Sequence, residues 1–360
     1  MLRNKSCYPG AMADFRFVDI CAGIGGTRIP FENRKVNKVT WRGLNGKCVF
    51  VSELDPRARK TYAQNFKRKL SLEKYIAQID TDFTKLEPSE IDDHELLLAG
   101  FPCQPFSQAG KRQGFEDERG KVFQKIADII LVKQPRVVLL ENVRGLLSLV
   151  NPVSKTKVID EIIAELERVG YYVPEPRILN ARDFGLPQNR SRVYIIAIHR
   201  EVAAEFNLVT SQDFDKYWPK IDPNVRESLT VGSFLDKKVP EKYTISDKLW
   251  KGHQDRKARN RANGKGFGFQ LFDKSSKYVA TISSRYFKDG SEVLIKQGGG
   301  RNPRKLSPRE GARLQGFPEN FQLDPSDMQA FCQIGNAVPV NVVRALAKTL
   351  KPFLITGIKY

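Results

Sequence analysis

Apolar runs and helical patterns alternate along most of this chain. Short apolar runs predict buried strands, and apolar residues that recur at helical spacing predict amphipathic helices. The predicted strands are 15–20, 48–52, 95–98, 136–140 and 193–198, and the predicted helices are 58–69, 122–132, 156–169 and 340–350. Strands that alternate with helices are typical of an α/β fold with a doubly wound, mostly parallel sheet. We therefore expect that fold class.

Polar and reactive side chains stand where these strands end. Asp19, Glu53 and Glu141 lie at the carboxyl ends of three predicted strands, and Cys103 follows another strand on the proline-containing loop 99–107. Ligands collect at this edge of an open α/β sheet. A free cysteine is more often a small buried apolar residue, so the loop alone allows either packing or a nucleophile. Four ligand-type residues at one edge favour the nucleophile.

A glycine-rich loop follows the first predicted strand. Its glycines are Gly23, Gly25 and Gly26. This arrangement is typical of a nucleotide-binding unit, although the spacing is not the G-x-G-x-x-G of dinucleotide enzymes. Glu53, at the tip of the second strand, stands where a ribose is usually held. The basic segment 34–47 predicts an exposed loop or insertion that lengthens the gap between the loop and Glu53.

The pattern changes after residue 200. Helical periodicity fades, and residues 251–265 contain six cations and a single acid. Such a run is more often only a solvated face, but basic loops interleaved with aromatic residues suit phosphate contact and base reading. We predict a catalytic and cofactor-binding domain over 1–200, a target-recognition domain with a hinge over 201–331, and a C-terminal helix over 332–360 that returns to the first domain. A Gly-Asn turn at 335–336 is expected to open the helix 340–350.

The charge balance points to an anionic partner. The 360 residues contain 60 Lys and Arg against 41 Asp and Glu, a formal net charge of +19, which favours nucleic acid. Five dispersed cysteines without a C-x-x-C pair, and three scattered histidines, predict neither a disulfide framework nor a metal site. No apolar run approaches the ~20 residues of a membrane span, and the N-terminus lacks a signal-peptide segment, so we expect a cytoplasmic protein.

Six motifs together resemble those of the C5-cytosine DNA methyltransferases, in the family's order and over essentially the whole chain. They are the cofactor motif 17–26, the nucleophile loop 100–104, the acid motif 141–143, the arginine pair in 188–192, the block 305–318, and the closing cofactor motif 335–336. The resemblance implies transfer of a methyl group from S-adenosylmethionine to C5 of a cytosine in double-stranded DNA. Because C5 is inaccessible in a stacked duplex, the base must be flipped out.

The resemblance assigns the chemistry to four side chains. The thiolate of Cys103 adds to C6 of the base, and Glu141 hydrogen-bonds the N3 and N4 edge. Arg192, supported by Arg190, stabilises charge that develops at O2. A thiol is mostly protonated at neutral pH, so a cation such as Arg192 would also have to favour the thiolate.

The resemblance also implies the cofactor contacts, and together with the basic patch it gives candidate DNA contacts. The cofactor residues are Asp19, Cys21, Gly23, Gly25, Glu53, Asp82, Phe83, Pro102, Val122, Asn336 and Ala337. The DNA candidates are Gln104, Ser107, Arg256, Arg259, Arg285 and Tyr286. Cys21 stands where the family often has phenylalanine, so the loss of that ring is expected to weaken or reshape cofactor binding.

The recognition region suggests a target. Segments 264–269 and 285–290 are similar to those of Dcm-like enzymes, which modify the inner cytosine of CCWGG. We expect a CCWGG or CCNGG-like site, and a monomeric, nucleoid-associated bacterial enzyme. It would be solitary or belong to a restriction-modification system whose endonuclease acts separately.

Three other interpretations compete with this one. A tRNA cytosine methyltransferase of the same family stays open, although the large basic variable domain favours DNA. A cytidine deaminase needs H-x-E and P-C-x-x-C; Leu96 lies two residues after His94, and Phe106 occupies the second cysteine position. A catalytically silent DNA-binding protein is disfavoured because Cys103, Glu141 and Arg192 are all present.

Overall fold

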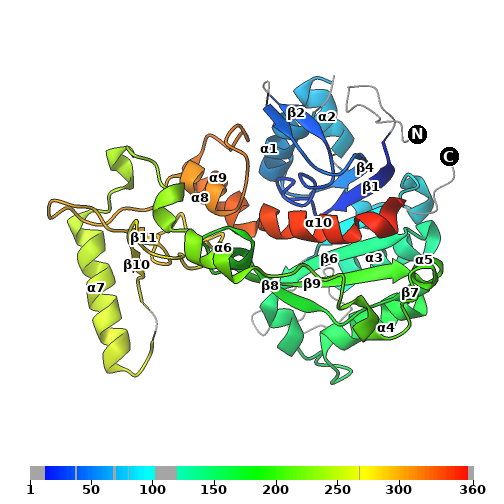
Figure 1. Cartoon of the computed structure of the whole chain (residues 1–360). Helices are drawn as coiled ribbons and strands as arrows, with labels where there is room; N and C mark the ends of the chain where they lie inside the picture. The colour runs from blue at the N-terminus through cyan, green and yellow to red at the C-terminus, as the bar shows by residue number, and fades with distance from the viewer. Residues whose placement is uncertain are drawn as a thin grey trace.

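The structure is a computed structural model that describes residues 13–36, 39–67, 70–79, 81–101, 120–266 and 268–355. A larger part built on a central sheet lies beside a smaller part that is poor in strands (Figure 1). Four candidate site residues, Pro102, Cys103, Gln104 and Ser107, lie outside the described residues.

The central sheet has seven strands. They are β1 (Phe15–Ile20), β4 (Gly46–Ser52), β5 (Leu96–Gly100), β6 (Val137–Val143), β7 (Tyr171–Tyr172), β8 (Arg177–Asn180) and β9 (Ser191–His199). The order is β4-β1-β5-β6-β9-β7, and β8 pairs with β9. The first four strands of this order run parallel, whereas β9 is antiparallel to β6, β7 and β8. The predicted doubly wound, mostly parallel α/β fold is confirmed.

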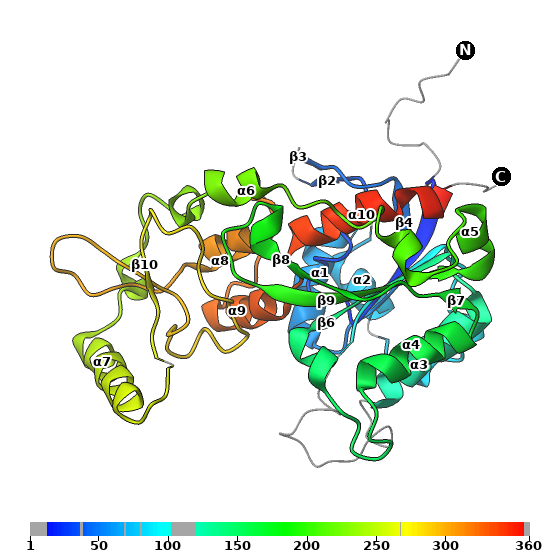
Figure 2. The same ribbon diagram turned by 60° about the horizontal axis from the view of Figure 1, so that its bottom comes forward.

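Strand alternation gives the sheet two different apolar faces. Phe17, Leu98 and Leu139 pack with α10 (Val340–Ile355), whereas Leu97 and Leu140 pack with α3 (Gly120–Lys133) and α4 (Val158–Arg168). Helices therefore cover both sides of the sheet (Figure 2). Because successive side chains along a strand point to opposite faces, Asp19, Gly100, Glu141 and Arg192 all belong to the α10 face.

The rest of the larger part surrounds this sheet. It includes β2 (Arg34–Val36), β3 (Val39–Trp41), α1 (Pro56–Phe66), α2 (Leu72–Ile79) and α5 (Arg200–Glu205). Asp55 begins α1, since its side chain accepts the N–H groups of Arg57 and Ala58. Of the two expectations for 34–47, an exposed loop or an insertion, the loop does not describe the whole segment, because β2 and β3 pair antiparallel there.

The smaller part is more helical than its sequence pattern indicates. It contains α6 (Pro223–Ser228), α7 (Asp247–Ala262), β10 (Leu271–Phe272), β11 (Leu294–Ile295), α8 (Pro308–Leu314) and α9 (Asp327–Asn336). The basic run predicted as loops forms most of α7, whose one buried residue is His253. The division at residues 200 and 331 stays a prediction, and Val202, Phe214 and Trp218 still pack in the core on the α10 face.

Short 3-10 helices connect these elements. They are η1 (Phe83–Lys85), η2 (Pro88–Glu90), η5 (Arg144–Ser148), η6 (Ala181–Phe184), η7 (Ser211–Phe214), η8 (Val231–Phe234) and η9 (Glu241–Tyr243).

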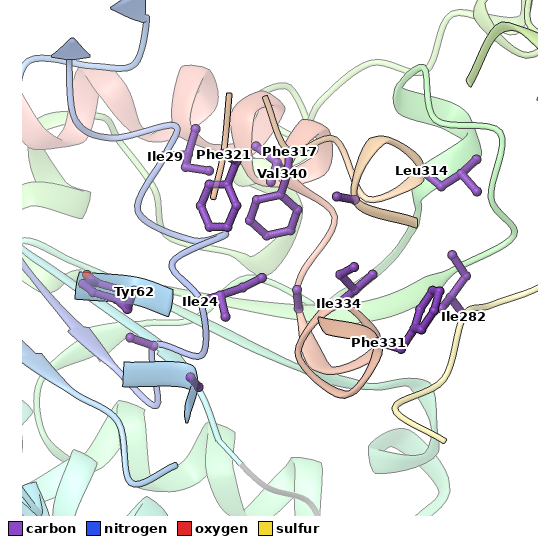
Figure 3. Packing of buried hydrophobic residues seen from close by; sticks show 14 of the residues in the cluster. Ile24, Ile29, Tyr62, Ile282, Leu314, Phe317, Phe321, Phe331, Ile334 and Val340 are labelled. Atoms are coloured by element: carbon purple, nitrogen blue, oxygen red, sulfur yellow. The ribbon is translucent and has the colours of Figure 1, made fainter. Parts of the chain in front are cut away.

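One apolar cluster joins the two parts. Ile24, from the glycine-rich loop, belongs to the same cluster as Phe317 and Phe321, which follow α8, and as Ile334 of α9 (Figure 3). A Cβ on Gly26 would stand 3.1 Å from Val338, between α9 and α10. The loop after β1 is therefore enclosed by the segment that the closing motif occupies.

Candidate active site

Three neighbouring strands place Gly100, Glu141 and Tyr194 in one row at the edge of the sheet. Gly100 is the Cα partner of Glu141, and Glu141 is the Cα partner of Tyr194. A Cβ on Gly100 would stand 3.5 Å from Glu141 Oε2 and meet no other atom of the described residues within 4 Å. The glycine thus places no side chain beside the carboxylate. Cys103 follows β5 by three residues.

Glu141 forms an ion pair with Arg192 across β6 and β9. Arg192 Nε lies 3.1 Å from Glu141 Oε1, and each side chain is 14% exposed. The pair forms because β9 is antiparallel, so that its first residues meet the last residues of β6. Burial raises the pKa of Glu141, and the charges of Arg192 and Arg190 oppose that rise. A carboxyl group held in this way, beside a fixed cation, suits hydrogen bonding to a base whose charge changes during a reaction.

Arg190 is buried directly before β9, and its hydrogen bonds hold the start of that strand in place. Its guanidinium donates to the main-chain oxygens of Ile282 (3.0 Å), Gly335 (2.8 Å) and Ala337 (2.7 Å). Burial lowers the pKa of Arg190 to about 9, and the charge of Arg192 adds to this effect. The side chain therefore acts on the site through Arg192, two residues further along the strand.

Gln188, three residues before β9, connects the segment that leads into this strand to two regions of the smaller part, the end of α8 and Ile282. Its Nε2 donates to Leu314 O at 2.9 Å and to Gln315 Oε1 at 3.0 Å, and its Oε1 accepts the N–H of Ile282 at 3.1 Å. Gln315 in turn donates to the main-chain oxygen of Ala337 at 3.0 Å. Gln188 and Gln315 are fully buried. They join β9, α8 and the end of α9 into one hydrogen-bonded junction.

Glu53 and the glycine-rich loop meet at the tip of β4. Glu53 accepts the N–H of Gly23 at 2.7 Å and that of Asp55 at 2.9 Å. Burial raises the pKa of this carboxyl group. Gly23 has φ of +55°, and a Cβ built on it would meet no atom of the described part of the chain within 4 Å. The loop therefore presents open space beside a carboxylate, which fits a ribose-containing ligand.

Asp19, near the end of β1, is a buried acid. Its carboxylate accepts hydrogen bonds from Thr27 Oγ1 at 2.8 Å and from the Tyr62 hydroxyl at 3.2 Å. Burial raises the pKa of Asp19 to about 7 against these hydrogen bonds. Arg28, also buried, donates to the Tyr62 hydroxyl at 3.0 Å and to Glu32.

Thr27 and Tyr62 were not among the predicted site residues. The available signal was a hydroxyl side chain directly after the glycines and a tyrosine on the apolar face of α1.

Asp82 and Phe83 differ in what they can offer a ligand. Asp82 begins η1 and accepts from Thr84 Oγ1 at 2.7 Å. The Phe83 ring is buried in the cluster with α3, so only its main chain is available at the edge. Val122, on α3, is half-buried. Cys21 has φ of +53°, and burial raises the pKa of its thiol to about 12.

Asn336 and Ala337 stand at the end of a helix. The expected turn at 335–336 is wrong, because α9 runs through Asn336 and α10 begins at Val340. The Asn336 side chain is exposed, whereas the Ala337 oxygen is held by Arg190 and Gln315. A Cβ on Gly335 would lie 2.3 Å from the carbonyl carbon of Ser283. The glycine is thus required for close packing against another segment.

The candidate DNA contacts differ in how far their side chains are exposed to solvent. Arg259 and Arg285 are exposed. Arg256 is half-buried and bonds the Asp289 carboxylate at 3.0 Å and His253 Nδ1 at 2.9 Å. A contact through the Tyr286 side chain is contradicted by the structure. Its ring is fully buried, and its hydroxyl donates to Val293 O at 2.6 Å and accepts from Leu306 N at 2.8 Å.

The described residues contain neither a membrane-spanning helix nor a cluster of metal ligands. No helix within them is long and apolar enough to cross a bilayer. No group of three or more His, Cys, Asp or Glu among them is arranged to hold a metal ion.

Comparison with known proteins agrees with this geometry. The family model for C-5 cytosine-specific DNA methylases matches residues 15–352. The chain is 45% identical over 340 residues to the Type II methyltransferase M.DsaV of Dactylococcopsis salina, covering 94% of this chain and 86% of that protein. It is also 45% identical over 340 residues to M.NlaX of Neisseria lactamica, covering 94% and 97%.

Solved structures share the fold. Dnmt2 methyltransferase of S. pombe superimposes with a TM-score of 0.69 at 20% identity, covering 94% of this chain and 99% of that one. The methyltransferase EhMeth of Entamoeba histolytica also gives 0.69, at 21% identity, covering 96% and 99%. Because the family model spans nearly the whole chain and the Type II relatives are 45% identical to it, this protein belongs to the C-5 cytosine-specific DNA methylase family.

Proposed function

We propose that this enzyme methylates C5 of a cytosine within a specific duplex DNA sequence, through a covalent bond between Cys103 Sγ and C6 of the base. The observation that carries the proposal is the Glu141–Arg192 pair, which lies beside Gly100 at the end of the strand that leads to Cys103. The 45% identity to Type II methyltransferases supports the same activity.

The chemistry follows from the poor nucleophilicity of C5. Addition of the Cys103 thiolate to C6 places electron density on C5, which then takes the methyl group. Glu141 hydrogen-bonds the N3 and N4 edge of the ring, and Arg192 holds the negative charge that develops at O2. Loss of the C5 proton and breakage of the bond between sulfur and C6 then release methylated DNA and the free thiol.

S-adenosylmethionine fits the edge formed by β1 and β4. When bound, it supplies an electrophilic methyl group. We assign Glu53 to its ribose hydroxyls, and Asp19 with Gly23 and Gly25 to its methionine end. We further assign Asp82 and the Phe83 main chain to the adenine edge, and Cys21, Pro102, Val122, Asn336 and Ala337 to the remaining lining. The open space at Gly23 beside the Glu53 carboxylate supports this assignment.

The proposal also covers the DNA sequence that the enzyme recognises and the kind of system to which it belongs. The similarity of segments 264–269 and 285–290 to Dcm-like recognition regions supports modification of the inner cytosine of a CCWGG or CCNGG-like site. The Type II names of the relatives support a restriction-modification setting, with any endonuclease acting separately. Bisulfite sequencing of DNA from a host that expresses the chain would report both the base and its context. Methylation of tRNA without methylation of duplex DNA would overturn the choice of substrate.

The covalent step is tested with DNA that carries 5-fluorocytosine at the target. Fluorine cannot leave C5 as the proton does, so the enzyme should remain bonded to the DNA in a denaturing gel. Cys103→Ala should abolish the adduct, whereas Cys332→Ala, at a half-buried thiol of α9, should leave it intact. An adduct that survives Cys103→Ala would overturn the assignment of the nucleophile.

A further inference from the structure

The hydroxyl of Tyr194 is buried beside the site without a partner. Tyr194 is fully buried, and its oxygen has no hydrogen-bond partner among the described residues. Other buried tyrosines are satisfied: the Tyr171 hydroxyl donates to Pro135 O at 2.6 Å, and that of Tyr286 to Val293 O at 2.6 Å. A buried polar group without a partner is unfavourable, and such groups call for an explanation beyond packing.

The position of Tyr194 connects it with Glu141. The two residues face each other across β6 and β9, where opposite side chains share one face of the sheet and their Cβ atoms lie about 5 Å apart. Arg192 lies two residues earlier on β9 and so belongs to the same face. Gly100, on the other side of Glu141, brings no side chain. Tyr194 is therefore the remaining polar neighbour of Glu141 in this row.

The electrostatic surroundings of the hydroxyl agree with this placement. Burial raises the pKa of Tyr194 well above its ordinary value, the Glu141 carboxylate raises it further, and Arg192 and Arg190 oppose the rise. The group is consequently a neutral O–H donor over the whole working range of pH. Packing alone does not require this oxygen, because phenylalanine fills the same volume without an unpaired hydroxyl.

Substrate binding would free an oxygen of the Glu141 carboxylate to accept a hydrogen bond from Tyr194. In the structure described here, Glu141 Oε1 is paired with Arg192. If Arg192 turns towards O2 of a flipped base, Glu141 loses its charge partner in a mostly buried position. Leaving a buried carboxylate unpaired is costly, and a donor already waiting on the same face reduces that cost.

We propose that Tyr194 is a positioning residue whose hydroxyl donates a hydrogen bond to the Glu141 carboxylate while Arg192 holds the base. This inference rests on the proposed function, because it requires the base in the site. The Tyr194 hydroxyl, which has no partner among the described residues, would then form its hydrogen bond only in the complex, at the expense of the stability of the free chain.

The test compares Tyr194→Phe with Tyr171→Phe in the full chain. Tyr171 is the matched control, because it is equally buried but its hydroxyl bonds Pro135 on the far side of the sheet from Glu141. Tyr194→Phe should keep or raise Tm, keep the affinity for target DNA, and slow single-turnover methyl transfer by about tenfold. Tyr171→Phe should lower Tm and leave the rate unchanged.

The pH profile separates positioning from packing. Among the described residues, the charged groups that act on Glu141 are Arg192 of β9 and Arg190, which directly precedes β9, while β5 contributes only Gly100. Loss of a donor to the carboxylate raises its pKa, so the limb of the rate profile that disappears in Glu141→Gln should move to higher pH in Tyr194→Phe.

An unchanged rate and profile, or a loss of Tm like that of Tyr171→Phe, would reduce Tyr194 to a packing residue. If the wild-type chain produced no methylated cytosine at all, the proposed function would fall, and this inference with it.

Discussion

Asn142 donates a hydrogen bond from Nδ2 to the main-chain oxygen of Phe101 at 3.0 Å. The acceptor follows the last residue of β5 and precedes Cys103 by two positions, and the donor follows Glu141 directly on β6. The Oδ1 of Asn142 accepts the N–H of Val143 at 2.8 Å, which fixes the orientation of the amide. One short segment of β6 thus holds both the Glu141 carboxylate and the start of the loop that contains the proposed nucleophile, Cys103.

We expect Asn142→Ala to slow formation of the 5-fluorocytosine adduct by at least tenfold, because the loop of Cys103 loses its attachment to the sheet. Asn151→Ala is a matched control, since Asn151 is equally buried and its Nδ2 donates to Glu161. Both variants should lose about 1–2 kcal/mol of unfolding free energy. Equal rates of adduct formation in the two variants would show that the bond to Phe101 has no catalytic consequence.

Glu141→Gln should reduce methyl transfer far more than DNA binding. The amide keeps the size of the side chain but loses the charge that pairs with Arg192, and a loss of about 10²–10³ in single-turnover rate is expected. DNA affinity, measured by fluorescence anisotropy, should change by less than threefold. Glu165→Gln, at an exposed pair with Arg168, controls for the change in net charge. Equal losses of rate and affinity would argue against a chemical role for Glu141.

Cofactor affinity should depend on pH through Asp19. Its pKa of about 7 means that the ionised form predominates only above that pH. A ligand with a cationic amino group favours the ionised carboxylate, so S-adenosylmethionine should bind more weakly as the pH falls below about 7. Binding near pH 6.5 should release protons, which calorimetry detects as an enthalpy that depends on the buffer.

Two variants sharpen this prediction. Asp19→Asn should remove the pH dependence, and Tyr62→Phe, which deletes one donor to Asp19, should move the midpoint to higher pH. The unligated wild-type chain should show the opposite trend in stability. Because the folded pKa lies above the ordinary one, the contribution of Asp19 is full below pH 4 and is lost as the pH rises towards 7. A flat binding profile between pH 6 and 8 would contradict the assignment of Asp19 to the cofactor's amino group.

Two glycine substitutions should have opposite effects. A Cβ on Gly335 would lie 2.3 Å from main-chain atoms of Ser283 and Ser284, which cannot move independently. Gly335→Ala should therefore lower the unfolding free energy by about 1–3 kcal/mol. Gly252 lies within α7, and a Cβ added to it would meet no atom of the described residues outside its own helix turn within 4 Å. Gly252→Ala should therefore raise the unfolding free energy by about 0.5–1 kcal/mol. Thermal unfolding followed by circular dichroism measures both changes.

The cations of α7 should contribute to DNA affinity through phosphates. Arg259 is exposed, so Arg259→Gln should weaken binding to specific and nonspecific duplexes alike and reduce the salt slope of the affinity by about 1. Arg256→Gln should in addition lower Tm, because Arg256 pairs with Asp289. A salt slope unchanged by Arg259→Gln would place the DNA away from this helix.

Burial explains which elements could be predicted. The strands of the sheet and the helices α3, α4 and α10 each have an apolar face against a core, so their periodicity is visible in the sequence. Helix α7 buries only His253 and leaves no such period. Gly335 and Asn336 are residue types typical of a turn, yet α9 continues through both. The glycine is present because a side chain there would collide with the main chain of residues 283 and 284.

The active site was predictable where the chain order alone brings residues together. Glu141 and Glu53 stand at the ends of parallel strands, which meet at one edge in any fold of this class. The direction of β9 depends on the path of the chain, and only that direction brings Arg192 to Glu141. Tyr62 and Tyr194 occupy positions that fit an apolar pattern, so nothing in the pattern distinguishes their hydroxyl groups from core packing.

The five residues 188–192, which lead into β9 and begin it, contact two different regions of the molecule. Gln188 and Arg190 bind main-chain oxygens of the smaller part and of α9, and Arg192 then meets Glu141. A rotation of the smaller part would therefore displace Arg192, the residue that we assign to the reacting ring. If the smaller part reads the DNA sequence, as we propose, a wrong sequence should be penalised at the chemical step as well as in affinity.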